Sequence, residues 1–349
     1  MELIDLLLYL SAPGRARPLS PEALAGIAGP VHSRVRPLLP LLHHELQRNC
    51  AMPVPPELAA AEFSASSHFE RMHKAQAELQ AILKQNSITH CIIKGSDIAD
   101  KYYPTPFLRP FVDIDLLIHS TDEDNIRRLL KTQGYVLKRE RPHYHLGYEK
   151  DGVPVEVHTD LFSYKYRVLF ELDAIQPERV LGAGGLSDEE YLLNFCLQFY
   201  DGMGRRLLPI VDIFQILHRG IDLSRWQQLA ASTETSFPVL FIQAYALEHF
   251  GVTLLTGPLL APFSVSAKHQ HRLRNLARTA IEKRETYPLI LAMAARRAAK
   301  LFRLVFPPAF VRKSYPPENR LSRLRHWMRI GRELSGRGQK AGPARSEKE

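Results

Sequence analysis

The hydrophobic positions from residue 63 onward first follow the period of a helix and then that of a strand. Residues 63–86 carry apolar side chains three or four positions apart, including Met72 and Leu79, and this spacing predicts an amphipathic helix. The short apolar run at 91–93 follows and predicts a buried strand. It leads into the sequence Lys-Gly-Ser at 94–96, where we expect a tight turn.

A second strand is predicted shortly after this turn. Pro104 and Pro106 stop a short helix, and beyond them Asp113 and Asp115 alternate with apolar residues. Side chains two positions apart in a strand point to the same face, so the two carboxylates are expected to lie roughly 6 to 7 Å apart and to face one volume of solvent.

A helix, a strand and a hairpin are predicted next. Residues 120–124 have the pattern of a capping box with an acidic first turn, so we expect a helix from here to about Gly134. Residues 135–140 form a candidate third strand. Alternating segments on either side of Asp151-Gly152 predict a hairpin, because Asp-Gly favours the two-residue turns that join antiparallel strands. Glu156 lies in its second arm, between two valines.

From residue 186 the pattern is helical, beginning with a second capping box at Ser187 and Glu190. Asp212 lies in one of these apolar helices and is expected to be a buried acid with its own partner. We therefore predict an α+β protein with a small mixed sheet. Its expected parts are a helical N-terminal cap (1–62), a sheet-containing domain (63–185), an all-helical domain (186–335) and a disordered basic tail (336–349).

The composition is that of a globular protein rather than a fibrous or membrane-spanning one. The chain has 349 residues, of which 45% are hydrophobic and 24% charged, enough for two domains with a sizeable core. No apolar run approaches the roughly 18 residues that cross a bilayer, and the N-terminus lacks the basic cluster of a secretion signal. The 3 cysteines lie far apart, which argues against a disulfide framework and a zinc site. We expect a cytoplasmic protein.

The net charge of +9 is unevenly distributed. Residues 271–349 carry 20 Lys and Arg against 6 Asp and Glu, whereas the preceding residues have a small excess of acids. Such a region can bind a polyanion such as nucleic acid or an acidic membrane surface, or it can be a solvated helix face followed by a polar tail. The charge pattern alone leaves both interpretations open.

Asp113 and Asp115 are candidate metal ligands. Two carboxylates this close raise the cost of ionising one another unless a cation lies between them. Mg²⁺ suits the pair, because it prefers carboxylate oxygens and usually keeps substrate phosphates among its ligands. Glu156 is the candidate third carboxylate, and His158 and Asp160 on the same strand face compete with it. We expect His158 to be a structural or substrate-orienting residue.

The turn before the short helix is a candidate phosphate site. Gly95 lets the backbone approach a bulky anion, and Ser96 lies where a helix begins, with free N–H groups and the positive end of the helix dipole. Lys94 could pair with a triphosphate or be a solvated lysine at a strand end. Arg109 could contact phosphate through two N–H groups or form a salt bridge that orients a strand carboxylate.

These motifs resemble those of the DNA polymerase β-like nucleotidyltransferase superfamily, which combines an apolar-Gly-Ser turn, an Asp-x-Asp strand and a later carboxylate. More closely, the chain is similar to a poorly characterised nucleotidyltransferase family found in bacterial biosynthetic gene clusters. The closer resemblance is carried by Ile93-Lys94-Gly95, Tyr102-Tyr103-Pro104, Arg109-Pro110, Asp113-Ile114-Asp115-Leu116-Leu117 and Glu156-Val157-His158.

The resemblance implies an enzyme that transfers a nucleoside monophosphate from a nucleoside triphosphate, such as ATP, to a hydroxyl or phosphate acceptor and releases pyrophosphate. Two Mg²⁺ ions would act in catalysis. The acceptor is a small molecule, sugar, peptide or RNA, and the sequence indicates neither which of these nor the oligomeric state. The implied residues are Asp113, Asp115 and Glu156 for metal binding and catalysis, and Lys94, Gly95, Ser96 and Arg109 for nucleotide binding.

A different class of protein is also compatible with the sequence. An inactive scaffold of the same fold could bind RNA or a biosynthetic partner through the basic C-terminal region. Loss of function on replacing Asp113 and Asp115 would separate the enzyme from the scaffold.

Overall fold

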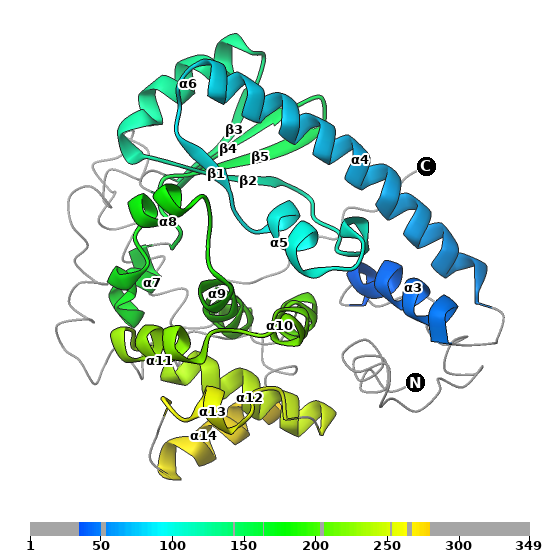
Figure 1. Ribbon diagram of the computed structural model, residues 1–349, viewed down its shortest axis with the longest axis vertical. Helices are drawn as coiled ribbons and strands as arrows, with labels where there is room; N and C mark the ends of the chain where they lie inside the picture. Colours follow the sequence, from blue (N-terminus) through cyan, green and yellow to red (C-terminus); the bar gives the residue numbers. More distant parts are fainter. Residues whose placement is uncertain are drawn as a thin grey trace.

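The computed structural model describes residues 35–49, 54–141, 144–162, 164–202, 206–251, 253–263 and 267–279. Figure 1 shows a sheet overlaid by the long helix α4 (Pro56–Gln85) and, on the other side of the sheet, a group of helices. The short helix α5 (Gly95–Tyr102) lies between the two parts. The predicted α+β class is confirmed.

The sheet of the described chain has five strands in the order β1-β2-β5-β4-β3. Strands β2 and β5 run parallel and the other neighbours antiparallel, so the sheet is mixed. The predicted hairpin is present as β4 and β5, and Asp151 and Gly152 have the positive φ angles, 52° and 72°, that its tight turn needs. The bounds are β1 His90–Ile92, β2 Ile114–Ile118, β3 Val136–Arg141, β4 His145–Lys150 and β5 Val153–His158.

One face of the sheet is covered by α4 and α6 (Glu123–Thr132), as Figure 1 shows. Because strand side chains alternate between faces, every second residue of β2 and β5 joins this core. Burying each of these side chains contributes about 1.5–3 kcal/mol, and the packing fixes β2 beside β5. The core includes Met72, Leu79, Leu83, Ile126, Leu130, Ile92, Ile114, Leu116, Val155 and Val157.

Two predicted helix starts are wrong. Helix α4 begins at Pro56 rather than at residue 63, because proline is well suited to the first turn of a helix. The domain boundary expected after residue 62 therefore lies inside this helix. Residues Ser120–Asp122 form a 3₁₀ turn, and α6 begins at Glu123 without a side-chain cap. The expected capping box at 120–124 is therefore absent.

The opposite face of the sheet is turned toward the helical part. Cys91, Ile93 and Leu117 project from this face into the helical core. Helices begin earlier than the predicted residue 186, since α7 and α8 precede it. The bounds are α3 Leu39–Asn49, α7 Tyr164–Phe170, α8 Pro177–Ala183, α9 Asp188–Asp201, α10 Leu208–Arg219, α11 Leu223–Ser232, α12 Ser236–Phe250, α13 Gly257–Leu260 and α14 Ala267–Thr279.

The helical part is built around buried aromatic side chains. Trp226 is fully buried, and its indole N–H donates to the Leu259 carbonyl at 2.8 Å. The capping box that begins α9 is confirmed: the Glu190 N–H donates to Ser187 Oγ, and the Ser187 N–H donates to Glu190 Oε2.

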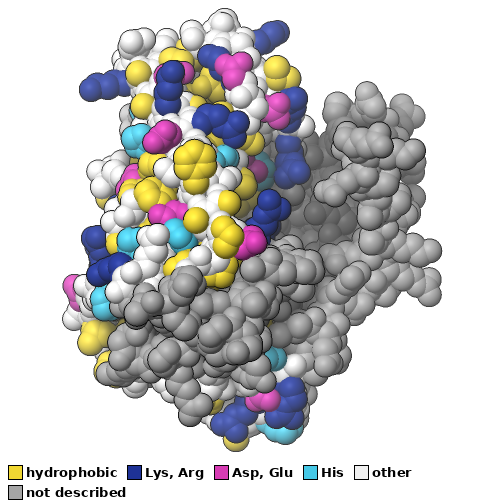
Figure 2. All heavy atoms as spheres, turned by 90° about the vertical axis from the view of Figure 1, so that its right-hand side faces the viewer, with side chains coloured by type: hydrophobic (Ala, Val, Ile, Leu, Met, Phe, Trp, Pro, Cys, Tyr) yellow, Lys and Arg dark blue, Asp and Glu magenta, His cyan; other side chains and the backbone are white. Residues whose placement is uncertain are grey.

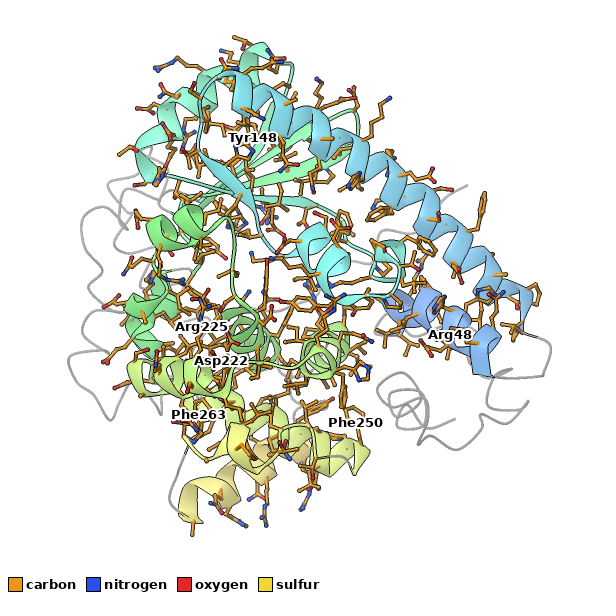
Figure 3. All side chains as sticks on the ribbon, viewed as in Figure 1. Arg48, Tyr148, Asp222, Arg225, Phe250 and Phe263 are labelled. Carbon is orange, nitrogen blue, oxygen red and sulfur yellow. The ribbon has the colours of Figure 1, made fainter. Side chains whose placement is uncertain are left out.

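In Figure 3, Tyr148 lies beneath α4, whereas Phe250 and Phe263 lie at the far end of the helical part. The division into separate domains stays a prediction.

Several expectations fall outside the described residues: most of the N-terminal cap, the end of the all-helical part from residue 280 on, the tail from 336, and nearly all of the basic C-terminal region. On the face shown in Figure 2, Lys and Arg side chains of the described residues are interspersed with Asp, Glu and hydrophobic ones. None of the helices in the described ranges combines the length and apolarity required to span a bilayer.

Candidate active site

The turn between β1 and α5 lies against the residues that precede β2. Gly95 has a φ angle of 28°, and a Cβ atom at this position would lie 3.4 Å from the Asp113 carbonyl oxygen and 3.5 Å from the Phe111 ring. A side chain here would be strained by the positive φ angle, although its Cβ atom would make only ordinary van der Waals contacts with both neighbours. The glycine thus permits the backbone conformation of the turn, which lies against the residues that precede β2.

Ser96 is buried at the start of α5, and its hydroxyl is already engaged. It donates to Gln76 Oε1 on α4 at 2.5 Å, and both side chains are buried. What this position can offer to a phosphate is therefore the backbone of the helix N-terminus rather than the hydroxyl. The nucleotide-binding role of Ser96 stays a prediction, and the backbone is the group that would perform it.

Asp115 and Glu156 are brought together by the parallel pairing of β2 and β5, in which they are register partners. His158 lies two residues after Glu156 and projects from the same face. One ligand atom from each of Asp115, Glu156 and His158 lies within 4.8 Å of the other two. Residues far apart in the sequence thus form one acidic cluster on the face opposite α4.

Two neighbours keep the Asp115 carboxylate charged. Its Oδ1 atom lies 3.4 Å from Lys94 Nζ and 2.8 Å from His158 Nε2. Burial alone would raise the pKa of Asp115, but the Lys94 charge and the His158 hydrogen bond outweigh burial and lower this pKa to about 2. The Lys94 ammonium is therefore neither free in solvent nor directed away from the cluster.

His158 acts on Asp115 as a neutral hydrogen-bond donor. Burial lowers the pKa of His158, so the ring carries a single proton at neutral pH, and the ionised Asp115 places that proton on Nε2. The other ring nitrogen, Nδ1, is buried and has no hydrogen-bond partner within the described part of the chain. The ring packs against Tyr144 and His145, with centroid separations of 5.4 and 5.3 Å. His158 thus makes a structural contact to Asp115, and a substrate-orienting role stays a prediction.

Asp113, directly before β2, is coupled electrostatically to the same cluster. Burial, followed by the negative charges of Asp115 and Glu156, raises the pKa of Asp113 to about 6 against the opposing charges of Lys94 and Arg206. The Asp113 carboxylate is not among the atoms that lie within 4.8 Å of one another. Three carboxylates nevertheless share one region, and their mutual repulsion is what a bound cation would relieve.

Two further side chains near Glu156 differ in their partners. Asp160, the competing candidate, forms an ion pair with Arg167, with Nε 2.8 Å from Oδ2. His145 is buried on β4, and its Nε2 atom lies 3.8 Å from Glu156 Oε1. Of the carboxylates considered on β5 and the residues that follow it, Glu156 is the one that faces Asp115.

Arg109 is held by the helical part of the molecule. Its Nε and Nη2 atoms donate to Asp212 Oδ1 and Oδ2 on α10 at 2.7 and 2.9 Å, and Tyr103 donates to Oδ1 at 2.7 Å. Arg109 Nη1 donates to the Gly95 carbonyl at 3.2 Å. Asp212 is thus the buried acid with its own partner that the sequence predicts. The alternative salt bridge between Arg109 and a strand carboxylate is wrong, because Arg109 pairs with Asp212 instead. A contact between Arg109 and phosphate stays a prediction.

The donor set suits a hard divalent cation. Asp113, Asp115 and Glu156 supply carboxylate oxygens, and burial together with the negative charges of Asp115 and Glu156 raises the pKa of Asp113. The Nε2 atom of His158 donates to Asp115, whereas its Nδ1 atom has no hydrogen-bond partner among the described residues. Asp115, Glu156 and His158 could therefore hold a metal ion.

Fold and site together define an α+β protein with an acidic cluster that suits a divalent cation beside a glycine turn. Within that class, the chain belongs to the family described as uncharacterised nucleotidyltransferase, whose model matches residues 33–251. This match covers more than half of the chain and includes every candidate site residue. Searches of curated proteins and of solved structures each found no match.

Several residues that shape the site were not found from the sequence. Gln76 binds the Ser96 hydroxyl, Tyr191 binds the backbone of Lys94, and Arg206 influences the charge of Asp113. Gln76 and Tyr191 lie on helices and Arg206 just before one, so helical periodicity does not reveal which strand they meet. Asp212 did give a signal, because a charged residue within an apolar helix needs a buried partner.

Proposed function

We propose that this protein transfers a nucleoside monophosphate from a nucleoside triphosphate to an acceptor hydroxyl or phosphate in a Mg²⁺-dependent reaction, in the manner of the DNA polymerase β-like superfamily. The observation that carries the proposal is the meeting of Asp115 and Glu156 across parallel strands, beside the glycine turn and Asp113. Membership of a nucleotidyltransferase family supports the reaction class.

The triphosphate would bind at the turn through charge and backbone groups. Lys94 places an ammonium group beside the acidic cluster, and the N-terminus of α5 offers backbone N–H groups and the positive end of its dipole. Gly95 leaves room for the backbone to approach the phosphates. Arg206, which is exposed and influences Asp113, adds positive charge near the same carboxylate.

The carboxylates would then act as metal ligands and as a proton acceptor. Asp113, Asp115 and Glu156 would hold Mg²⁺, which neutralises phosphate charge and lowers the pKa of the attacking group. Glu156 is partly exposed, and one of its carboxylate oxygens would accept the proton of the acceptor hydroxyl. The acceptor oxygen forms a bond to the α-phosphorus while the bond from the α-phosphorus to the bridging oxygen breaks, and pyrophosphate leaves with that oxygen.

His158 would hold Asp115 in place for this reaction. Its Nε2–H bond keeps one Asp115 oxygen fixed and leaves the other free for a metal ion. The assignment of residues 63–185 to catalysis and of 186–335 to acceptor binding belongs to the same proposal, as does a cytoplasmic location.

The test is to follow label from the nucleotide. The purified protein is incubated with Mg²⁺, cell extract and each of ATP, CTP, GTP and UTP, labelled either at the α- or at the γ-phosphate. Nucleotidyl transfer predicts that the α-label joins the acceptor and the γ-label leaves with pyrophosphate. Asp115→Asn should abolish transfer, whereas Glu149→Gln, which removes a charge from β4 outside the cluster, should retain it.

Two results would overturn the proposal. Transfer of the γ-label to the acceptor would indicate a kinase. If the cellular function of the protein persists in Asp115→Asn, the protein acts as a scaffold. In that alternative the basic C-terminal region recruits RNA or a partner.

A further inference from the structure

The backbone of the Lys94–Gly95 turn, between β1 and α5, has a conformation that its own sequence does not favour. Lys94 has φ 59° and ψ −145°, a region that is populated almost only by glycine. A residue with a side chain is retained there when the surrounding structure fixes the backbone on both sides. Contacts to the neighbouring peptide groups therefore decide whether this turn keeps its shape.

Helix α9 fixes the first side of the turn. The hydroxyl of Tyr191 accepts a hydrogen bond from the Lys94 N–H at 3.1 Å and donates one to Asp97 Oδ2 at 2.5 Å. Asp97 is held in turn by Lys101, whose Nζ atom lies 2.8 Å from the same oxygen. Tyr191 is fully buried, so its hydroxyl position is set by packing as well as by these two bonds.

Helix α10 fixes the second side. Asp212 binds two nitrogen atoms of Arg109, and the third nitrogen of this guanidinium donates to the Gly95 carbonyl at 3.2 Å. Asp212 is fully buried and Arg109 is 7% exposed, so the pair is shielded from water and rigidly placed. The peptide groups on either side of the Lys94–Gly95 bond are thus both held by hydrogen bonds, one to Tyr191 on α9 and one from Arg109, which Asp212 on α10 holds in place.

We propose that Tyr191 and the Asp212–Arg109 pair form a clamp that keeps the Lys94–Gly95 turn in the shape required for binding the triphosphate. This inference rests on the proposed function. It makes Tyr191 and Asp212 positioning residues for nucleotide binding: they act on the turn and make no contact with the nucleotide. The helical part therefore contributes to nucleotide affinity in addition to any contact with the acceptor.

The first experiment tests the clamp without nucleotide. Urea denaturation midpoints are measured for Lys94→Ala and Lys94→Gly, each with and without Tyr191→Phe. When the turn is clamped, glycine relieves the unfavourable backbone conformation and raises the midpoint relative to alanine. Loss of the Tyr191 hydroxyl lets the turn relax. The difference in midpoint between Lys94→Gly and Lys94→Ala should then decrease by at least about half. An unchanged advantage would overturn the clamp.

The second experiment measures the effect on binding. The dissociation constant of each of ATP, CTP, GTP and UTP is determined with Mg²⁺ and without acceptor for the wild type, Tyr191→Phe and Tyr102→Phe. Tyr102 is the matched control, because its hydroxyl also joins α5 to α9, through Asp188, and its ring lies 6.1 Å from the Tyr191 ring. The clamp predicts about tenfold weaker binding for Tyr191→Phe and less than about twofold for Tyr102→Phe.

The outcomes separate the clamp from the function on which it rests. Equal weakening by both variants would show that α9 merely supports the fold, and unchanged binding in Tyr191→Phe would also overturn the clamp. If the wild type bound none of the four nucleotides, the proposed function would fail and with it the nucleotide role of the turn. The denaturation experiment would still show separately whether Tyr191 fixes the Lys94 backbone.

Discussion

Asp113→Asn should stabilise the metal-free protein at neutral pH while abolishing its activity. The pKa of Asp113 is about 6 in the folded protein, against 3.8 for an unperturbed aspartate. The folded state therefore binds this proton more tightly, so ionised Asp113 destabilises the fold above pH 6, and stability returns as the pH falls toward 3.8. At about 1.36 kcal/mol for each pKa unit, the ionised carboxylate lowers the free energy of unfolding by up to about 3 kcal/mol. Because the carboxylate is partly exposed to solvent, we expect a value of about 1–3 kcal/mol.

The assay is urea denaturation in the presence of a chelator at two pH values. The free energy of unfolding of the variant should exceed that of the wild type by about 1–3 kcal/mol at about pH 7.5. The difference should be less than about 0.7 kcal/mol at about pH 4, where Asp113 is protonated in the folded protein. The control is Glu149→Gln on β4, whose carboxylate is partly exposed and lies 3.4 Å from Lys138 Nζ. A surface pair of this kind should change stability by less than about 1 kcal/mol at either pH.

Two results would contradict this prediction: Asp113→Asn is no more stable than the wild type at the higher pH, or it gains the same stability at both pH values. Either result would show that burial and the charges of Asp115 and Glu156 do not raise the pKa of Asp113. Added Mg²⁺ should reverse the order, because the wild type gains binding free energy that the variant lacks. A thermal denaturation series in Mg²⁺ measures this reversal.

Three further predictions concern the support of the site. His158→Phe keeps a buried ring but removes the donor to Asp115, so turnover should fall about 10- to 100-fold with the fold retained by circular dichroism; unchanged turnover would contradict the orienting role. Asp212→Asn leaves the Arg109 charge buried without its counter-charge and should lower stability by about 3–5 kcal/mol, whereas Tyr103→Phe should cost only about 1 kcal/mol in the same denaturation assay. Chelation of divalent ions should abolish nucleotidyl transfer, and Mg²⁺ alone should restore it; activity that survives chelation would exclude the metal role.

Local pattern was sufficient for much of the fold. The hairpin at Asp151-Gly152 is confirmed because the two residues tolerate positive φ angles, and the α9 capping box is confirmed because its bonds join neighbours in sequence. Period-two alternation likewise placed Asp115 on the face opposite the core under α4. The 3₁₀ turn at Ser120 shows the limit, since a capping pattern does not specify which helix type begins there.

By itself, the sequence singled out the candidate residues: two aspartates two positions apart, a glutamate on a hairpin arm and a glycine in a tight turn. Only the tertiary structure decided which of them meet and which have other partners. Parallel pairing of β2 and β5 brings Glu156 to Asp115, Arg109 turns to Asp212, and Tyr191 meets the Lys94 backbone. These contacts join residues that are tens of positions apart, and local periodicity carries no information about which strand or helix will lie beside another.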